Sequence, residues 1–367
     1  MTKRIKILFT IPNFDTAGSG KVVYDLVKGL DKTMFEPEIC CFHNKGAFFK
    51  TIEQLGVKIH LFQFATPYRP YITFPFRVFK IYKFFKQNNF DIIHSWHWSS
   101  DISEPLAAKI AGIPFVYTKK AMGWGNKSWI WRSRLSRKII TINKDMVTQF
   151  FSHMLDKVEE ISLGVDTNYF KPLQKAYVIP EGISISREDF IILSVANLVP
   201  VKGIEVLLEA VTELKDDNIK VFIVGTDDTD YGIALKKQYI SSKNIKFLGK
   251  QQDVRPYLAI ADVFVIPTKN EGRKEGLPIA PIEAMAMGRI VLGSNVSGIK
   301  DILKPFSNCL FEAESIVDLQ NKLIRIMNLD NNEKLKIEVQ MRQHIEFNYT
   351  VFQFVSKHEK LYKSLKR

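Results

Sequence analysis

The chain has 367 residues, of which 46% are hydrophobic and 25% charged, a balance that excludes a long disordered region and suits two domains better than one. Its formal net charge is +13, and nearly all of the excess lies in two stretches without acids, residues 68–89 and 119–138. The three cysteines include the adjacent pair Cys40 and Cys41, which excludes a disulfide framework and favours a reducing compartment.

The first predicted element is a short apolar run that ends before Pro12. It is too short for a signal peptide or a membrane span, so it predicts a buried strand of a cytoplasmic protein. Similar runs then alternate with helical patterns, which is typical of parallel sheets covered by helices. The first half is expected to contain strands at residues 6–11, 38–42, 58–62, 91–95, 115–118, 139–142 and 159–162, and helices at 21–30, 76–87 and 102–111.

A stretch with several prolines and glycines, residues 168–188, has no clear period and predicts the domain boundary. After it the same alternation restarts, which indicates a second domain similar to the first. The sequence thus predicts an α/β fold of two Rossmann-like domains, residues 1–172 and 173–348, followed by a terminal helical segment at 349–367. The expected strands are 190–195, 221–225, 246–249, 263–267 and 290–294, and the expected helices are 203–214, 279–287 and 349–365.

The first glycine-rich turn, AGSGK at 17–21, follows a strand and opens a helix. It does not fit a phosphate-binding P-loop, because Asp15 replaces the first glycine and Val22 replaces the hydroxyl, and Val23 breaks the dinucleotide fingerprint. Its backbone N–H groups at a helix start can still face an anion, which makes Gly18, Ser19 and Gly20 candidate binding residues. A tight turn from strand to helix is the alternative interpretation.

The second such turn, NLVPVKG at 197–203, also leads from a strand into a helix. Lys202 lies where it can neutralise a phosphate that the helix dipole already favours. A single lysine at this place is usually only solvated. Its significance depends on the segment that comes later in the chain.

That segment is EGLPIAPIEAMAMG at 275–288. It places Glu275 on a loop and Glu283 about two turns into a helix. Two carboxylates in this arrangement suit the hydroxyls of a sugar and a ribose, and exposed N–H groups at Leu277–Ala280 suit phosphate oxygens. The simpler alternative, an acid favoured by the helix dipole, accounts for Glu275 alone but not for the combination.

With these motifs, the chain resembles the retaining glycosyltransferases of family 4, which have the GT-B fold. The chain is similar to capsule, exopolysaccharide and lipopolysaccharide transferases, and its KNEGRK insertion at 269–274 resembles the longer form of some capsule and exopolysaccharide transferases. The resemblance implies two Rossmann-like domains whose parallel sheets face each other across a cleft, with the C-terminal helix returning to the first domain. It covers nearly the whole length and rests on AGSGKVVYDLVKGL, DIIHSW, ISLGVDTNYFKP, ILSVANLVPVKG, FIVG, IKFLGKQQDVRPYLAIADVFVIPT and EGLPIAPIEAMAMG.

The resemblance also implies roles for single residues. Lys202 would hold the donor diphosphate, Glu283 the ribose hydroxyls and Glu275 the hydroxyls of the donor sugar. From the first domain, Gly18, Ser19 and Gly20 would contact the donor. From the second domain, the backbone or side chains of further residues would contact it, namely Asn197, Lys250, Gln251, Gly276, Leu277, Pro278 and Ile279. Of these, Lys250 and Gln251 would contact the base.

The chain departs from the family pattern at two places. Asn197 stands where the family often has an arginine on the diphosphate. Lys119 and Lys120 stand where the family commonly has a histidine, and either could supply the missing charge, with Lys120 favoured by register. His94 and His97 follow a strand at its carboxyl end, where α/β sheets bind ligands, and are either functional or simply packed.

The implied reaction moves a hexosyl unit from a nucleotide diphosphate sugar to a hydroxyl of a glycan or lipid-linked acceptor, with retention. UDP is favoured by its frequency in the family. No aspartate cluster suggests a metal, so no cofactor is expected, and Lys202, Lys120 and helix N-termini would stabilise the leaving diphosphate. The alternatives are another GT-B enzyme such as an epimerase, and a nucleic-acid-binding protein that uses the basic first half. Nucleic-acid binding does not account for Glu275 and Glu283, so no nucleic-acid partner is expected.

The two acid-free stretches predict contact with an anionic membrane surface. In the first, Arg77, Lys80, Lys83 and Lys86 recur at steps of three on a predicted helix. In the second, Trp124, Trp129 and Trp131 stand among lysines and arginines, a mixture that suits a lipid headgroup layer. A peripheral position on the inner face of the membrane is therefore expected.

Overall fold

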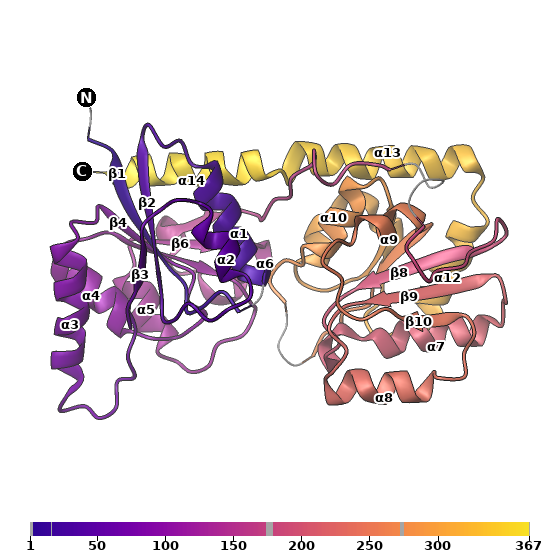
Figure 1. Cartoon of the computed structure of the whole chain (residues 1–367), viewed down its shortest axis with the longest axis horizontal. Coiled ribbons are helices and arrows are strands. Elements are labelled where there is room, and N and C mark those ends of the chain that lie inside the picture. The colour runs from indigo at the N-terminus through magenta and orange to yellow at the C-terminus, as the bar shows by residue number, and fades with distance from the viewer. Residues whose placement is uncertain (1–2, 16, 174–178, 272–274, 367) are drawn as a thin grey trace. The chain divides into compact units, whose positions relative to one another are not determined.

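The structure is a computed structural model that describes residues 3–15, 17–173, 179–271 and 275–366. Parts of the predicted boundary stretch and of the KNEGRK insertion lie outside the described residues. The chain forms two compact units, one of Met1–Leu163 with Val351–Arg367 and the other of Gly164–Thr350 (Figure 1). The sequence predicted that the first domain ends at residue 172, whereas the contacts assign residues 164–172 to the second unit.

Two arginines of the second unit bind this segment. The guanidinium of Arg342 donates to the carbonyl oxygen of Phe170 over 3.2 Å. The guanidinium of Arg255 lies 3.7 Å from the centre of the Tyr169 ring. These contacts explain why the chain changes unit at Gly164, before the stretch whose prolines and glycines suggested a linker.

The first unit contains a seven-stranded parallel sheet of order β3-β2-β1-β4-β5-β6-β7. Its strands are short and apolar on both faces because helices cover both faces of a parallel sheet. The strands are β1 (Ile5–Thr10), β2 (Phe35–Cys41), β3 (Ile59–Leu61), β4 (Ile92–Ser95), β5 (Phe115–Lys119), β6 (Lys138–Thr141) and β7 (Val158–Glu160). The helices are α1 (Ala17–Gly29), α2 (Phe49–Glu53), α3 (Phe74–Gln87), α4 (Ser103–Ala111), α5 (Trp129–Leu135), α6 (Lys144–Phe150) and α14 (Val351–Leu365).

The terminal helix α14 completes the core of the first unit. It packs beside α1, and the Tyr362 hydroxyl and the His94 ring nitrogen Nδ1 form a buried hydrogen bond of 2.6 Å. The carboxylate of Glu359 accepts a hydrogen bond of 2.8 Å from the backbone N–H of Asp31. The last residues of the chain therefore stabilise the unit in which the chain begins.

The second unit contains a six-stranded parallel sheet of order β10-β9-β8-β11-β12-β13, so the order of its strands repeats the plan of the first. The strands are β8 (Phe190–Val195), β9 (Ile219–Val224), β10 (Ile245–Phe247), β11 (Val263–Ile266), β12 (Ile290–Ser294) and β13 (Leu310–Phe311). The helices are α7 (Ile204–Leu214), α8 (Asp230–Gln238), α9 (Arg255–Ile260), α10 (Ala280–Ala286), α11 (Ile299–Ile302), α12 (Ile316–Met327) and α13 (Asn331–Asn348). The predicted α/β architecture with parallel sheets is confirmed.

One strand begins earlier than the sequence suggested. β2 starts at Phe35, whereas the sequence predicted a strand at 38–42, and it includes Pro37. Pro37 pairs with Ile7 of β1, while the pairing of β2 with β3 begins only at Ile39. Proline is tolerated there because β2 has a neighbouring strand on one side only at that point.

The second acid-free stretch is not the open basic surface that the sequence suggested. Trp124 and Trp129 stack on each other with ring centres 5.2 Å apart and pack against the core of the first unit. Lys119 and Arg132 are buried. The use of this stretch as a headgroup layer was therefore wrong for these four residues, whereas Trp131 is exposed.

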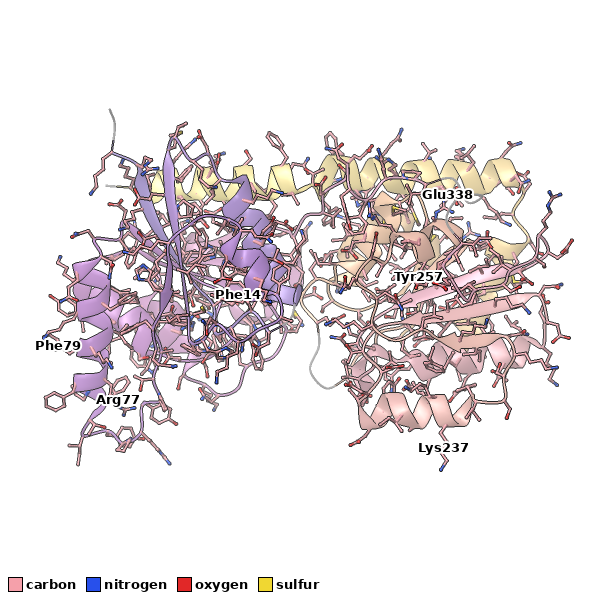
Figure 2. The ribbon with its side chains drawn as sticks, viewed as in Figure 1. Phe14, Arg77, Phe79, Lys237, Tyr257 and Glu338 are labelled. Atoms are coloured by element: carbon pink, nitrogen blue, oxygen red, sulfur yellow. The ribbon has the colours of Figure 1, made fainter. Side chains whose placement is uncertain are left out.

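The first stretch forms α3 and the loop before it. Val78, Ile81 and Phe85 of α3 are buried, whereas Phe79 lies on the outer face of the helix and points away from the sheet (Figure 2). Arg77 donates hydrogen bonds to carbonyl oxygens of the preceding loop and fixes the loop on the helix. Among the helices that the structure describes, none is both long and apolar enough to cross a bilayer.

Candidate active site

The second sheet reverses its direction of growth between β8 and β11, since β9 and β10 lie beyond β8 while β12 and β13 lie beyond β11. Parallel α/β sheets bind ligands at such a switch point, beside the carboxyl ends of the two strands. Lys202 lies after β8, and Glu275 lies after β11. Two predicted site residues therefore come from the two connections that this rule selects.

Lys202 and Glu275 are in direct contact. The ammonium group of Lys202 donates to Oε1 of Glu275, although the residues are 73 positions apart in the sequence. The two side chains are 15% and 26% exposed, so the pair is largely shielded from water. The second carboxylate oxygen, Oε2 of Glu275, is buried and has no hydrogen-bond partner among the described residues.

The backbones of the two loops are also joined. Gly203 adopts a left-handed conformation with φ 62°, and a Cβ atom there would lie only 2.1 Å from the carbonyl oxygen of Pro267. The N–H of Lys269 donates to the carbonyl oxygen of Val201 over 2.8 Å. Since only glycine permits both the conformation and the close approach, Gly203 keeps Lys202 beside the loop that follows β11.

A cluster that sequence reasoning missed joins the loop after β11 to α7. The Lys269 ammonium binds the Glu205 carboxylate of α7 and lies 3.2 Å from Oε1 of Glu271. The hydroxyl of Tyr231 donates to the other oxygen of Glu205, and burial and this carboxylate raise the pKa of Tyr231. The hydrogen bond to Glu205 likewise raises the pKa of Lys269. These groups come from separate elements, so no local sequence pattern signals them.

Glu283 lies in the first turn of α10, on a helix whose other residues are mostly buried, and its own side chain is half-buried. The segment leading to the helix is buried at Gly276, Leu277 and Pro278 and partly exposed at Ile279. Gly298, with φ 82°, passes so close that a Cβ atom on it would lie 2.2 Å from the carbonyl oxygen of Gly276. Packing therefore fixes the backbone between the two predicted glutamates.

The other predicted residues of the second unit lie after β8 and β10. Asn197 is exposed directly after β8. Gln251 uses its side-chain amide to donate to the carbonyl oxygen of Leu248 over 2.7 Å, which closes the turn after β10, and Lys250 is exposed on that turn. The backbone N–H of Gly225 donates to the carbonyl oxygen of Gly249 over 2.9 Å and links this turn to β9.

The first sheet has its own switch point between β1 and β4. The start of α1, which follows β1, carries the predicted glycine turn of Gly18, Ser19 and Gly20. Gly18 has non-helical torsion angles and is exposed, whereas Gly20 is buried. The ammonium group of Lys120, just after β5, donates to the hydroxyl of Ser19 over 3.1 Å. Two predicted elements of the first unit, the glycine turn and Lys120, are thus brought together.

The structure separates the roles of the adjacent lysines. The Lys119 ammonium points inward, donates to the carbonyl oxygens of Ala121 and Gly123, and lies 3.8 Å from the centre of the Trp124 ring. Burial lowers the pKa of Lys119 to about 7. Lys119 therefore holds the chain after β5 in place, while Lys120 is partly exposed beside Ser19.

The two histidines also differ. His94 is fully buried between the Tyr362 hydroxyl and the Thr118 hydroxyl, and burial holds its pKa well below the usual value, so it is a packed core residue. His97 is only partly buried, and burial together with the cations of Arg132 and Lys120 lowers its pKa to about 3. Within the described residues, no group of three or more His, Cys, Asp or Glu side chains is arranged to hold a metal ion.

A buried polar network lies at the carboxyl ends of β1 and β4. Arg132 of α5 and Glu104 of α4 are fully buried and form an ion pair of 3.1 Å. The Glu104 carboxylate also accepts hydrogen bonds from the hydroxyls of Thr10 and Ser95, the last residues of the two strands. The Arg132 guanidinium donates to the carbonyl oxygen of Asp101 over 2.9 Å. Nothing in the sequence indicated this network, because its charged members look like surface residues.

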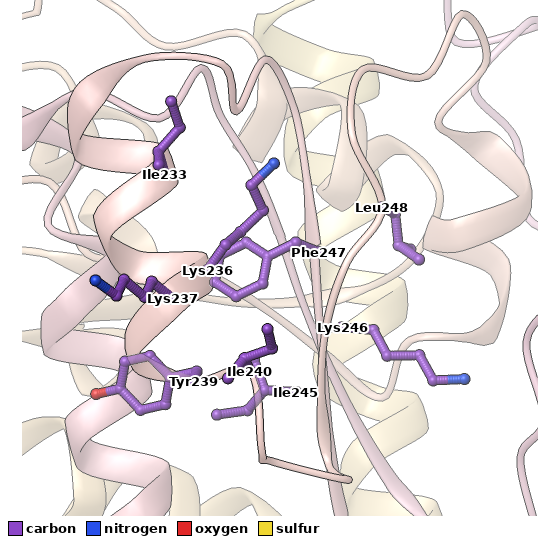
Figure 3. Close-up of a pocket in the computed structure, with 9 residues that line it drawn as sticks. All are labelled: Ile233, Lys236, Lys237, Tyr239, Ile240, Ile245, Lys246, Phe247 and Leu248. Atoms are coloured by element: carbon purple, nitrogen blue, oxygen red, sulfur yellow. The ribbon is translucent and has the colours of Figure 1, made fainter.

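A pocket of about 630 Å³ lies elsewhere on the second unit, between α8 and the edge strand β10 (Figure 3). Apolar side chains such as Ile240 and Phe247 line it together with the stems of lysines, including Lys236. None of the predicted site residues lines this pocket.

Comparison with known proteins agrees with the geometry of both units. Residues 16–169 match the family described as Glycosyltransferase Family 4, and residues 179–344 match the family described as Glycosyl transferases group 1. The chain belongs to the family 4 glycosyltransferases. The two matches cover the second sheet and all of the first sheet except β1, and they include the glycine turn, Lys202, Glu275 and Glu283.

This glycosyltransferase is 24% identical over 357 residues to the capsular polysaccharide biosynthesis glycosyltransferase CapH of Staphylococcus aureus, covering 94% of this chain and 93% of the relative. It is 27% identical over 270 residues to the UDP-Gal:alpha-D-GlcNAc-diphosphoundecaprenol alpha-1,3-galactosyltransferase of Escherichia coli, covering 67% of this chain and 68% of the relative. The crystal structure of HepE from Anabaena with UDP and glucose superimposes with a TM-score of 0.79 at 18% identity, covering 98% of this chain and 100% of HepE. The glycosyltransferase accordingly has the GT-B fold.

Proposed function

We propose that the enzyme transfers a hexosyl unit from a UDP sugar to a hydroxyl of a glycan or lipid-linked acceptor, with retention and without a metal ion. The observation that carries the proposal is the convergence of Lys202 and Glu275 at the switch point of the second sheet. The choice of UDP and of a lipid-linked acceptor is supported by the E. coli relative, whose name includes both, and UDP also by the complex of HepE.

In this proposal the second unit holds the donor. Lys202 binds the diphosphate, Glu275 accepts hydrogen bonds from the sugar hydroxyls, and Glu283 accepts them from the ribose. The backbone from Gly276 to Ile279, together with Asn197, contacts the phosphates and sugar, and the turn at Lys250 and Gln251 contacts the base. The side chain of Gln251 is already engaged with its own turn, so its contact to the base is through the backbone.

The first unit contributes the turn from Gly18 to Gly20 and the ammonium group of Lys120. The hydrogen bond between Lys120 and Ser19 supports this assignment, because it places a cation on a turn whose helix start favours an anion. Lys120 would supply part of the positive charge that an arginine in place of Asn197 would provide. Lysine ammonium groups and backbone N–H groups stabilise the leaving diphosphate, whose oxygen assists attack by the acceptor on the same face of the sugar.

The nucleotide contacts are tested by replacing Lys202 or Glu283 with alanine. Each variant is expected to bind UDP about 10- to 100-fold more weakly, since a hydrogen bond to a charged group is worth about 1.5 to 3 kcal/mol. A thermal-shift panel with UDP, GDP, ADP and CMP first identifies the preferred nucleotide, because a ligand of the folded state raises its stability. Calorimetry with that nucleotide then compares the variants, with Lys237→Ala, an exposed lysine of α8, as the control. Unchanged affinity in both variants would show that the site is assigned wrongly.

We also propose that the first unit docks on an anionic membrane, where a lipid-linked acceptor is met. The surface consists of α3 and the loop before it, which contain no acid and expose Tyr71 (65%), Ile72 (87%), Phe76 (75%) and Phe79 (49%). Lys80 and Lys83 are exposed on the same helix, and the Lys83 ammonium lies 4.9 Å from the centre of the Phe79 ring. Aromatic side chains beside lysines suit the headgroup layer, where each cation contributes about 1 kcal/mol.

Flotation with phosphatidylglycerol vesicles tests the membrane surface. The wild-type protein is expected to co-float at low salt and much less at high salt, because salt screens the cations. Phe76→Ser/Phe79→Ser is expected to remove most of the binding at low salt. Ile240→Ser is the matched control, since Ile240 is 81% exposed on the other unit. No co-flotation of the wild type, or an equal loss in the control, would rule the surface out.

A further inference from the structure

The contact between Lys202 and Glu275 joins two groups that the proposed function assigns to different parts of the donor. The Lys202 ammonium donates to Oε1 of Glu275. The diphosphate and the carboxylate are both anions, and both require this one ammonium group. The Glu275 carboxylate therefore occupies the ammonium group that the diphosphate would bind.

The Glu275 side chain of this pair has hydrogen-bonding capacity that the contact with Lys202 does not use. Oε2 of Glu275 is buried and has no hydrogen-bond partner within the described parts of the chain, so this carboxylate can still accept hydrogen bonds. The nearby Lys269 cannot replace Lys202, because the carboxylates of Glu205 and Glu271 already bind it. A ligand that reaches both groups is therefore needed to separate the pair without leaving a charge unpaired.

We propose that Glu275 makes the site discriminate between the nucleotide sugar and the free nucleotide diphosphate by competing with the diphosphate for Lys202. The inference rests on the proposed function. When the intact donor binds, its sugar hydroxyls donate to Glu275 and its diphosphate takes Lys202, so both groups exchange partners.

A free nucleotide diphosphate keeps its ribose hydroxyls, which are assigned to Glu283, but it lacks the hydroxyls of the transferred sugar that Glu275 would bind. If it takes Lys202, the Glu275 carboxylate loses its cation and gains no hydrogen bond in return, which is costly at a shielded site. Glu275 thereby weakens the binding of the product relative to that of the donor. The same carboxylate that recognises the sugar thus promotes the release of the nucleotide after transfer.

Calorimetry with UDP on the full chain tests the proposal. Glu275→Gln is expected to bind UDP about tenfold more tightly than the wild type, a change of about 1.4 kcal/mol, because the neutral amide holds Lys202 less strongly. Lys202→Met is expected to weaken UDP binding. In the Lys202→Met background the added Glu275→Gln change is expected to give no gain, because no ammonium group remains to be released.

A control variant distinguishes local competition from a general loss of negative charge. Glu271→Gln removes the same charge four positions earlier but contacts Lys269, so it is expected to leave UDP affinity unchanged. Equal tightening by Glu271→Gln, or by Glu275→Gln in the Lys202→Met background, would mean simple repulsion and overturn the proposal. Unchanged UDP affinity in Glu275→Gln overturns it as well. If Lys202→Met itself leaves UDP binding unchanged, the proposed function of the site fails instead.

Discussion

Glu275→Gln is expected to lower kcat by about 100- to 1000-fold, the effect of removing one preorganised electrostatic group from an active site. Glutamine keeps the size of the side chain but removes its charge. The carboxylate is proposed to accept hydrogen bonds from the donor sugar and to face the positive charge that develops on the sugar ring as the bond to the diphosphate breaks. Initial rates at saturating donor and acceptor measure the effect. The variant thus gains affinity for UDP while it loses turnover.

The same assay is also applied to a control variant and, to test the metal-free mechanism, to the wild type in EDTA. Glu271→Gln changes an exposed acid on the same loop and is expected to keep kcat within about twofold, as surface substitutions usually do. Wild-type activity is expected to persist in EDTA. Activity that stops in EDTA and returns with manganese would show that a metal ion polarises the diphosphate, and normal turnover in Glu275→Gln would remove this residue from the reaction.

The sequence predicts the strands well because a parallel sheet requires short apolar segments that recur at helix-length intervals. β8 runs from Phe190 to Val195 and β11 from Val263 to Ile266, close to the expected ranges. Once the strand order is known, the loops after these strands must meet at one edge of the sheet, which brings Lys202 to Glu275. The motifs predicted which residues form the site, and the strand order explains why these residues lie close together.

Residues that act through contacts between distant segments escape such reasoning. Lys269 and Glu205 meet only because Gly203 lets two loops touch, and nothing in either segment predicts the other. Lys119 and Arg132 were mistaken for surface residues because a count of charges cannot show which of them point inward. The basic residues at steps of three predicted the helix α3 correctly, but they did not show that its buried side includes Val78 and leaves Phe79 exposed.

The buried pair of Arg132 and Glu104 gives the largest expected effect on stability. Arg132→Met is expected to lower the free energy of unfolding by about 3 to 5 kcal/mol, because it leaves the Glu104 carboxylate charged and unpaired in the core. The Ser95 and Thr10 hydroxyls that donate to Glu104 do not replace a positive charge. Urea unfolding followed by circular dichroism measures the change.

Two further variants separate the loss of the pair from the loss of packing. Arg134→Met lies on the same helix, but its side chain is exposed beside Trp131, so its cost is expected to stay within about 0.5 kcal/mol. Adding Glu104→Gln to Arg132→Met is expected to recover part of the loss, because the amide is neutral. Its oxygen can accept from one of the two hydroxyls, and its NH2 group can donate to the oxygen of the other. If the double variant loses as much free energy of unfolding as Arg132→Met and Glu104→Gln lose in sum, the loss comes from packing. The unpaired buried charge is then not what makes Arg132 necessary.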